Sequence, residues 1–250
     1  RILDQVGDVL VFSILYGWGE PLLHPQFPRM VEKCSERNIK TLTSTNGQHL
    51  QTMDEALALV DAGLDALIIA MDGSRQDSYK AYRRGGQLDR VRRCTEIIEA
   101  AKTHRGSALP YTNLRAVVTS ENEYQLHEIR SFARDAGVNM FAAKTLGCQP
   151  DTDTYSDFQA TGEDMGRFGA DRGRRDCQAP VNCPFPFRQP TVFWDGTAVG
   201  CEFDHELEQP WGRVGEDDFS ELWNSPGARH LRATTTGAAT GPRFCSRCPY

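Results

Sequence analysis

The sequence predicts an α/β fold built on a parallel sheet, followed by a small second domain that is rich in cysteine. Three observations lead to this prediction. Apolar, β-forming runs alternate with amphipathic runs at a spacing of about 30 residues, as in βαβ units. Each β-forming run ends in small or polar residues, and four cysteines gather towards the carboxyl end. The alternation alone allows either a barrel or a doubly wound open sheet.

The alternation runs from residue 9 to residue 145. The predicted strands are, in chain order, 9–15, 39–45, 64–71, 111–118 and 138–143. The predicted helices are 25–38, 52–62, 88–102 and 121–136. Gly63 and Gly137 stop two of these helices, and the run 64–71 is almost entirely apolar, which is typical of a parallel strand covered on both faces.

Helical periodicity selects the side chains that we expect in the core. In the helix 25–38 these are Phe27, Met30, Val31 and Cys34, and in the helix 88–102 they are Val91, Thr95, Ile98 and Ala101. Cys34 and Cys94 are scattered along helical stretches, and we expect both to behave as small buried hydrophobic residues.

The loop after the first strand contains Gly17, Gly19, Glu20 and Pro21. The glycines let the backbone turn tightly and approach a ligand, and Pro21 ends the strand. Glu20 is thereby held at the carboxyl end of a strand, which is where parallel α/β folds bind ligands. A carboxylate beside exposed carbonyl groups suits an ammonium group. The alternative is an ordinary strand-to-helix turn with a solvated glutamate.

Composition and charge narrow the classes of function. The chain has 250 residues, 25% charged residues and a net charge of −6, which argues against a general binder of nucleic acid backbones. It contains no apolar run long enough for a membrane span and no G-x-G-x-x-G dinucleotide fingerprint. Small molecules and peptides remain as partners. We expect a cytoplasmic protein, of which the sequence from Arg1 is one piece.

The chain divides into three predicted parts: a barrel over 1–146, a polar linker or loop over 147–180, and a small domain over 181–250. Cys148 and Cys177 flank the polar loop. The small domain should contain a β-hairpin that turns at Asp195-Gly196 and a short helix over 218–224. A unit this short needs an additional staple for stability.

Cys183, Cys201, Cys245 and Cys248 are the candidate staple. Cys245-x-x-Cys248 places two thiolates on one centre through a tight turn, and the hairpin adds the other two. Four thiolates fit either a tetrahedral zinc ion or an iron–sulfur cluster, so coordination chemistry alone does not choose between them.

The pattern around these cysteines is more specific. Gly196, with four residues between it and Cys201, and the segment 211–215 (Trp-Gly-Arg-Val-Gly) resemble the SPASM/twitch auxiliary-cluster domain of radical S-adenosylmethionine (SAM) enzymes. Upstream, 17–25 (Gly-Trp-Gly-Glu-Pro-Leu-Leu-His-Pro) is similar to the "GGEPLLHP" segment of their barrel. The segments 45–47, 71–73 and 79–83 also match the barrel's motifs.

The resemblance implies a partial (β/α)₆ barrel followed by a cluster domain. It implies SAM as cofactor, bound by Gly17, Gly19, Glu20, Pro21, Asn46, Gly47, Asp72, Arg83 and Arg115. It also implies an auxiliary [4Fe–4S] cluster on Cys183, Cys201, Cys245 and Cys248. The activity implied is hydrogen-atom abstraction from a peptide or small molecule by a 5′-deoxyadenosyl radical, with electrons from a flavodoxin-like or ferredoxin-like donor.

The sequence departs from the family pattern in three places. The C-x-x-x-C-x-x-C that binds the SAM-cleaving cluster is absent from these 250 residues, and we expect it upstream of Arg1. Trp18 separates the two glycines before Glu20, and Ala70 stands where the family often has serine. The alternative function is a non-catalytic barrel with a Cys₄ zinc module, acting as a binding or scaffold protein.

Overall fold

The computed structural model describes residues 2–146, 158–161, 182–246 and 248. The chain forms two compact units, one over residues 10–167 and one that joins residues 1–9 to 168–250. The first unit carries the predicted α/β alternation and the second carries the predicted hairpin and cysteines. Each unit is described here by itself.

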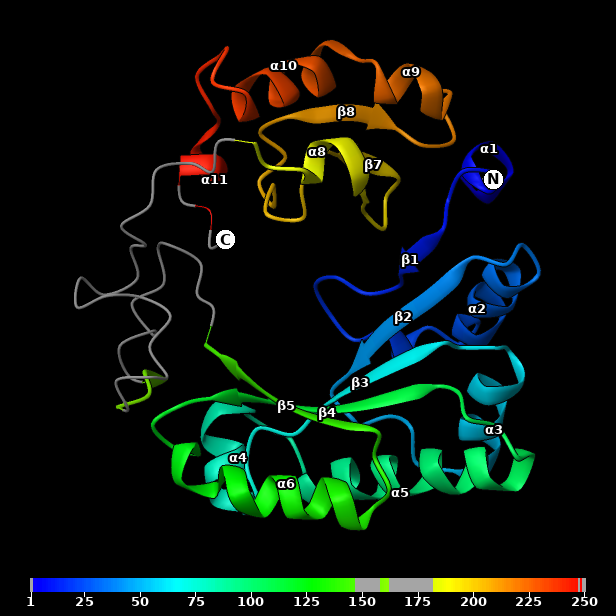
Figure 1. The fold of residues 1–250 in the computed structure, drawn as a ribbon, viewed down its shortest axis with the longest axis vertical. Coiled ribbons are helices and arrows are strands. Elements are labelled where there is room, and N and C mark those ends of the chain that lie inside the picture. Colours follow the sequence, from blue (N-terminus) through cyan, green and yellow to red (C-terminus); the bar gives the residue numbers. More distant parts are fainter. Residues whose placement is uncertain (1, 147–157, 162–181, 247, 249–250) are drawn as a thin grey trace. The chain divides into compact units, whose positions relative to one another are not determined.

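The first unit is built on five parallel strands that are neighbours in chain order (Figure 1). These are β1 (Phe12–Ile14), β2 (Lys40–Thr45), β3 (Ala66–Ala70), β4 (Tyr111–Val118) and β5 (Met140–Thr145). A doubly wound sheet reverses its strand order at a switch point, whereas a barrel adds each strand beside the previous one. The observed order is therefore that of a partial barrel.

Helices cover one face of this sheet (Figure 1). They are η1 (Pro21–Leu23), α2 (Phe27–Ser35), α3 (Met53–Asp61), α4 (Gln76–Tyr82), α5 (Leu88–Arg105), η2 (Glu123–Gln125) and α6 (Leu126–Asp135). The core lies between the helices and the sheet, where Val31, Leu67, Ile98 and Leu114 are fully buried. Helix α3 begins with a capping box in which Thr52 and Glu55 satisfy each other's backbone amides.

Most of the predicted core positions are confirmed. Cys34 and Cys94 are buried, and so are all four side chains expected on the inner face of α5. Met30 was expected in the core but is 40% exposed. The buried stripe of α2 follows Phe27, Val31 and Cys34, which leaves Met30 beside the stripe. Helix α4 was not predicted, because its sequence is polar apart from its aromatic residues.

The first strand is shorter than predicted. Strand β1 covers Phe12–Ile14, with further backbone hydrogen bonds that join Val11 O and Leu15 N to β2, and Val11 is 77% exposed. Among the described strands β1 has a neighbour on one side only, so its β-forming residues are not all held in a ladder.

The second unit contains an antiparallel sheet of β6 (Thr191–Val192), β7 (Thr197–Val199) and β8 (Pro210–Arg213). Its helices are α1 (Ile2–Val6), α8 (Phe185–Arg188), α9 (Phe219–Trp223), α10 (Pro226–Thr235) and α11 (Arg243–Ser246). The predicted hairpin is confirmed: Gly196 has φ +90°, and the Asp195 carboxylate accepts hydrogen bonds from Thr197 N at 3.0 Å and Thr197 Oγ1 at 2.8 Å. The chain's first helix belongs here too, since Gln5 Oε1 accepts a hydrogen bond from Phe219 N at 2.9 Å.

An arginine among aromatic rings organises the core of this second unit. The Arg232 guanidinium lies 4.2 Å from the centre of the Trp223 ring and 5.3 Å from that of Trp211. The same group donates hydrogen bonds to the carbonyl oxygens of Trp223 and Pro186, at 2.7 and 3.0 Å. Cation–π contacts and charge-assisted hydrogen bonds therefore support a core that is otherwise small.

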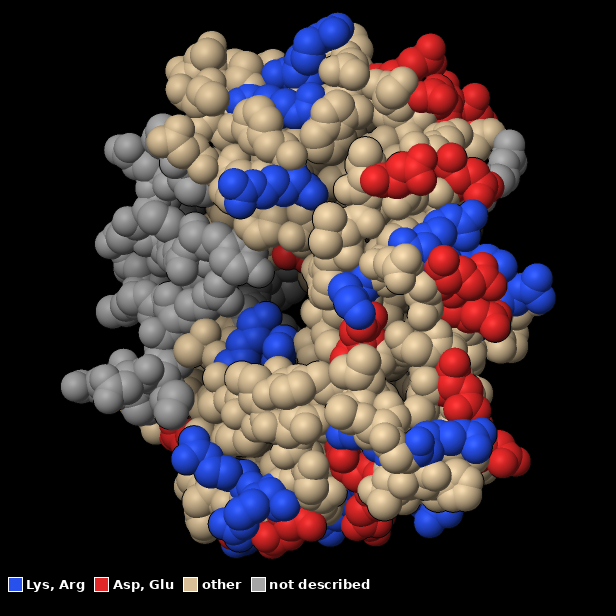
Figure 2. Space-filling view, turned by 45° about the vertical axis from the view of Figure 1, so that its right-hand side comes forward, with Lys and Arg blue, Asp and Glu red and all other residues tan. Residues whose placement is uncertain are grey.

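Two surface features bear on the classes of partner. On the face shown in Figure 2, basic and acidic side chains occur in small mixed groups over the described surface. None of the described helices combines the length and the apolar character that a bilayer span requires.

The predicted polar loop, with Cys148 and Cys177, lies outside the described residues except for residues 158–161.

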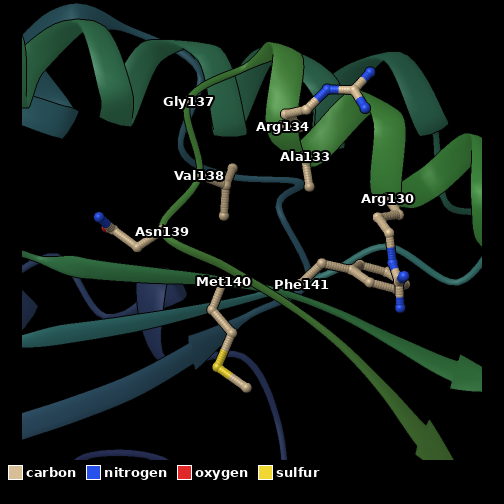
Figure 3. Close-up of a pocket in the computed structure, with 8 residues that line it drawn as sticks. All are labelled: Arg130, Ala133, Arg134, Gly137, Val138, Asn139, Met140 and Phe141. Atoms are coloured by element: carbon tan, nitrogen blue, oxygen red, sulfur yellow. The ribbon is translucent and has the colours of Figure 1, made fainter.

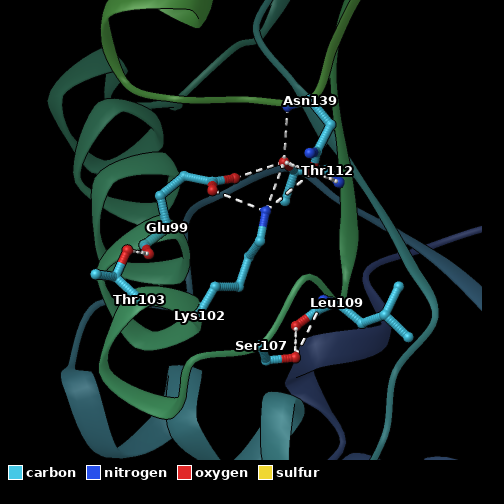
Figure 4. Close-up of polar contacts among 7 residues, drawn as sticks. All are labelled: Glu99, Lys102, Thr103, Ser107, Leu109, Thr112 and Asn139. Atoms are coloured by element: carbon cyan, nitrogen blue, oxygen red, sulfur yellow. Dashed lines mark hydrogen bonds and ion pairs between the residues drawn. The ribbon is translucent and has the colours of Figure 1, made fainter.

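A buried polar network closes the amino end of β4 (Figure 4). Lys102 Nζ donates to Glu99 Oε2 at 2.8 Å and to Asn139 Oδ1 at 2.9 Å, while Thr112 Oγ1 donates to Glu99 Oε1 at 2.5 Å. The Lys102 and Glu99 side chains are only 7% and 14% exposed. This network joins α5 to the ends of two strands, on the side of the sheet away from the predicted ligand site.

We expect the substitution Lys102→Met to lower the free energy of unfolding by about 3 kcal/mol, because it leaves the Glu99 carboxylate buried without its cation. Urea unfolding of the full chain measures this. The matched control is Lys33→Met, whose ion pair with Glu36 is 45% and 48% exposed and should contribute less than about 0.5 kcal/mol. Equal effects of the two substitutions would contradict the assigned role of the network.

Candidate functional site

The predicted ligand-binding residues of the first unit meet at the carboxyl ends of the strands. Glu20 follows β1, Asn46 and Gly47 follow β2, Asp72 follows β3, and Arg115 lies on β4. Because the strands are parallel and adjacent, these positions share one edge of the sheet.

Glu20 is the most highly connected of these residues. Its Oε1 accepts hydrogen bonds from Leu22 N at 3.1 Å and from Thr45 Oγ1 at 2.9 Å, and its Oε2 accepts one from Asn46 N at 2.6 Å. The carboxylate thus joins the loop after β1 to the loop after β2. A carboxylate has about four acceptor positions, so a position on Oε2 stays open for one further donor.

The backbone around Glu20 has the conformation that its sequence predicts. Gly19 has φ +115°, which disfavours any residue with a side chain. A Cβ atom added to Gly17 or Gly19 would meet nothing within 4 Å, so the backbone here is uncovered. Pro21 begins η1 and Glu20 caps it, which fixes the carboxylate relative to the turn.

Gly47 has a packing reason to be glycine. Its φ is +72°, and a Cβ atom there would lie 3.1 Å from the Cα atom of Val91 in α5. Asn46 bends the chain just before it, since its Oδ1 accepts a hydrogen bond from Gln48 N at 2.9 Å. This asparagine turn presents the amide of Asn46 to Glu20.

Asp72 is fully buried and uses both carboxylate oxygens within the protein. Oδ1 accepts a hydrogen bond from Val117 N at 2.6 Å, and Oδ2 accepts one from Arg83 Nε at 2.5 Å. The Arg83 side chain is 34% exposed, and its guanidinium lies 5.5 Å from the centre of the Tyr82 ring. Asp72 therefore orients Arg83, and Arg83 is the member of the pair that solvent or a ligand can reach.

Asn122 is a component of the site that the sequence analysis missed. Its Nδ2 donates to the carbonyl oxygens of Asp72 at 2.9 Å and Val117 at 2.8 Å, and its Oδ1 accepts from Thr119 N at 2.8 Å. It is fully buried, and it ties the end of β3 to the end of β4. The sequence held one signal for this role: Asn122 lies in a polar loop directly after the predicted strand 111–118.

Arg115 lies on the face of β4 opposite the helices. Asn113, Arg115 and Val117 are half-buried, whereas the alternate positions between them are fully buried against the helices. Within the described residues the Arg115 guanidinium makes no hydrogen bond or ion pair, and Asn113 Oδ1 is buried without a hydrogen-bond donor. This face of the sheet therefore offers polar groups that a ligand can use.

Residues 158–161 return to the same edge of the sheet. The Phe158 carbonyl accepts a hydrogen bond from Ser120 N at 3.1 Å, and its ring meets the Tyr82 ring edge-on with centres 5.5 Å apart. The Glu123 carboxylate accepts hydrogen bonds from Thr161 N, at 2.9 Å, and from Thr161 Oγ1. The contact with Tyr82 brings this segment next to Arg83.

A depression of the first unit lies away from these residues. It is lined by residues of α6, the following turn and the amino end of β5 (Figure 3). Its two basic side chains already have partners: Arg130 stacks on Phe141 at 5.5 Å, and Arg134 pairs with Asp135 at 3.0 Å. It shares no residue with the predicted ligand edge, at the opposite ends of the strands.

In the second unit, the four predicted cysteine ligands are close enough to repel one another as thiolates. Burial, assisted by repulsion from the other cysteines, raises the pKa values of Cys201 and Cys245 to about 12. No group of three or more described His, Cys, Asp or Glu residues is arranged to hold a single metal ion.

Two family profiles match this chain. The radical SAM superfamily profile matches residues 1–133, and the SPASM iron–sulfur cluster-binding domain profile matches residues 183–249. The chain belongs to the radical SAM superfamily. Its order of domains and its cofactors, SAM and an iron–sulfur cluster, are those predicted from the sequence motifs.

Relatives of this radical SAM protein include a cofactor-modifying protein and a maturase, by their names. A tungsten-containing aldehyde ferredoxin oxidoreductase cofactor-modifying protein of Pyrococcus furiosus is 28% identical over 153 residues, which cover 58% of this chain and 41% of that protein. The mycofactocin maturase MftC of Mycobacterium tuberculosis is 25% identical over 162 residues, covering 65% and 40%. The matched stretch thus spans about two fifths of either relative.

Solved structures share the fold at low sequence identity. Streptococcus suis SuiB bound to S-adenosylmethionine has a TM-score of 0.66 and 15% identity over 93% of this chain and 59% of that chain. The structure of anSMEcpe with bound AdoMet has a TM-score of 0.61 and 15% identity over 94% and 72%. These similarities confirm the partial barrel followed by a small cluster-binding domain.

We expect Asn122→Ala to lower the free energy of unfolding by about 3 kcal/mol, because three buried backbone groups lose their partners. Thermal and urea unfolding of the full chain measure this loss. Asn224→Ala is the control, since its amide bonds only the exposed end of α9 and should cost less than about 0.5 kcal/mol. A small effect at Asn122 would show that the ends of β3 and β4 are held by other contacts.

Proposed function

We propose that this chain is the barrel and auxiliary-cluster portion of a radical SAM enzyme that abstracts a hydrogen atom from a peptide or a small molecule. The observation that carries the proposal is the succession of a radical SAM region and an iron–sulfur cluster-binding domain on one chain. The maturase and cofactor-modifying relatives support a modifying enzyme of the peptide maturase or dehydrogenase type. When bound and reduced, the SAM–cluster pair supplies a 5′-deoxyadenosyl radical, and the protein supplies position and electrostatics.

Glu20 holds the amino group of SAM in this proposal. Three of its acceptor positions are filled by the protein, so the carboxylate is already fixed when the ligand arrives. The remaining position on Oε2 accepts one N–H of the ammonium group, and the uncovered backbone at Gly17 and Gly19 adds carbonyl acceptors. The loops after β1 and β2 owe their shape to Pro21, Asn46 and Gly47, and these residues contribute to SAM binding through that shape.

Arg115 and Arg83 are the proposed partners for carboxylates. Arg115 lies on the open face of β4 without a described partner, and an arginine fork matches a carboxylate in two hydrogen bonds. Arg83 is oriented by the buried Asp72, so Asp72 acts on a ligand through Arg83 rather than by contact. In this arrangement the SAM carboxylate pairs with Arg115. Arg83 is then available to a carboxylate of a ligand that binds beside Phe158.

The exposed edge of β1 supports an upstream segment that completes the barrel. Val11 is 77% exposed and Phe12 is 45% exposed, beside a strand edge that has no described neighbour. A further parallel strand would pair with these backbone groups and cover these side chains. We propose that the C-x-x-x-C-x-x-C of the SAM-cleaving cluster follows this strand.

The auxiliary cluster sits on Cys183, Cys201, Cys245 and Cys248 in this proposal. These four thiolates would fill the protein coordination of a [4Fe–4S] cluster, which would stabilise the small unit and supply an acceptor for the electron left after hydrogen abstraction. An external donor of the flavodoxin or ferredoxin type supplies the electron that starts the reaction.

The role of Glu20 is tested by SAM binding to the full enzyme. Glu20→Ala should weaken SAM affinity by about 2 kcal/mol, or roughly 30-fold, because a charge-assisted pair is lost. Calorimetric titration measures the change. Thr45→Val is the control: it removes one neutral hydrogen bond to Glu20 but keeps the charge, and should cost less than about fivefold. Unchanged affinity in Glu20→Ala would make this residue a turn cap only.

The cluster ligands are tested by iron analysis of anaerobically purified protein. The chain should be brown and hold about four iron atoms at this site. Cys201→Ala should remove them and lower the melting temperature of the small unit, whereas Cys34→Ala, in the barrel core, should leave the iron content unchanged. A colourless chain with one zinc ion would favour the scaffold alternative instead.

A further inference from the structure

We propose that Asp204 and Glu208 form an acidic clamp, which fixes two cysteine-bearing segments to each other and lowers the reduction potential of the cluster held there. The inference rests on the cluster ligation proposed above and adds residues that no motif of the sequence includes. The clamp is built entirely within the second unit.

Asp204 fixes the loop that leaves Cys201. Its backbone N–H donates to the Cys201 carbonyl oxygen at 3.1 Å, so the chain turns directly after the cysteine. Its carboxylate then accepts hydrogen bonds from Glu208 N at 2.7 Å and Gln209 N at 2.9 Å. The residue is 1% exposed, so this loop is closed around a buried carboxylate.

Glu208 carries the connection to the second pair of cysteines. Its Oε2 accepts a hydrogen bond from the backbone N–H of Arg243 at 3.0 Å, and Arg243 begins α11. Cys245 lies in that helix, where its N–H donates to the Pro242 carbonyl oxygen at 3.0 Å. Hydrogen bonds therefore run from the Cys201 turn through Asp204 and Glu208 to the segment of Cys245.

The same two carboxylates lie within electrostatic reach of the thiols. Asp204 is buried three residues after Cys201, and Glu208 bonds to the amide of Arg243, two residues before Cys245. Negative charge near a cluster opposes the gain of an electron, so it lowers the reduction potential.

Asp204 uses both of its carboxylate oxygens, Oδ1 for Glu208 N and Oδ2 for Gln209 N. An asparagine has one carbonyl oxygen, so Asp204→Asn removes one of these hydrogen bonds together with the charge. Glu208 accepts its hydrogen bond from Arg243 N on one oxygen, which the oxygen of a glutamine can replace. Glu208→Gln therefore removes the charge and keeps the contact.

The test compares three variants of the reconstituted full chain: Asp204→Asn, Glu208→Gln and the control Glu206→Gln. Glu206 is exposed and belongs to the same loop, so it changes the net charge equally without belonging to the clamp. The measurements are iron content and a potentiometric titration followed by electron paramagnetic resonance. Asp204→Asn and Glu208→Gln should shift the midpoint potential of this cluster to more positive values, and Asp204→Asn should also reduce iron retention. Glu206→Gln should match the unmodified chain in both.

The outcomes separate this inference from the proposed ligand set. If Cys201→Ala keeps its full iron content, the ligand assignment fails. If Cys201→Ala loses its iron but the midpoint potentials of both clamp variants equal that of Glu206→Gln, the proposed clamp fails and the ligand assignment stands. If Asp204→Asn cannot hold a cluster, Glu208→Gln decides, and an unchanged potential there overturns the proposal.

Discussion

The ligand edge of the barrel depends on how the backbone is satisfied where the parallel strands end. Amides that leave a strand have lost their ladder partners, and inside a protein an unpaired amide is costly. Glu20 supplies acceptors to two such amides, Leu22 N and Asn46 N, and to the hydroxyl of Thr45. One carboxylate thereby fixes two loops and keeps an acceptor position open, so in the proposed function the structural and binding requirements fall on the same residue.

Asp72 and Asn122 apply the same principle one strand further along. Asp72 accepts from the amide of Val117, and Asn122 donates to the carbonyls of both Asp72 and Val117. The ends of β3 and β4 are therefore locked by side chains that a ligand does not reach. Arg83 gains a fixed orientation from this buried pair, which reduces the conformational entropy that binding would otherwise cost.

The small unit reaches stability by different means. Its strands are short and its apolar core is limited, so aromatic rings around Arg232 and the loop around Asp204 contribute much of its order. Burial raises the pKa values of Cys201 and Cys245 to about 12, so the proposed cluster ligation would have to displace their protons. The loop and helix that carry these thiols are already joined through Glu208.

The sequence by itself determined the alternation of strands and helices, the hairpin at Asp195-Gly196 and the positions of Glu20 and the four cysteines. These features depend on local periodicity, on turn chemistry and on spacing along the chain, which are all written in short stretches. Only the tertiary structure decided that Asp72 accepts hydrogen bonds from Arg83 and Val117, that Asn122 joins two strands, and that Glu208 connects Asp204 to the helix of Cys245. These contacts join residues from separate elements, and no local pattern specifies which buried polar group will meet which.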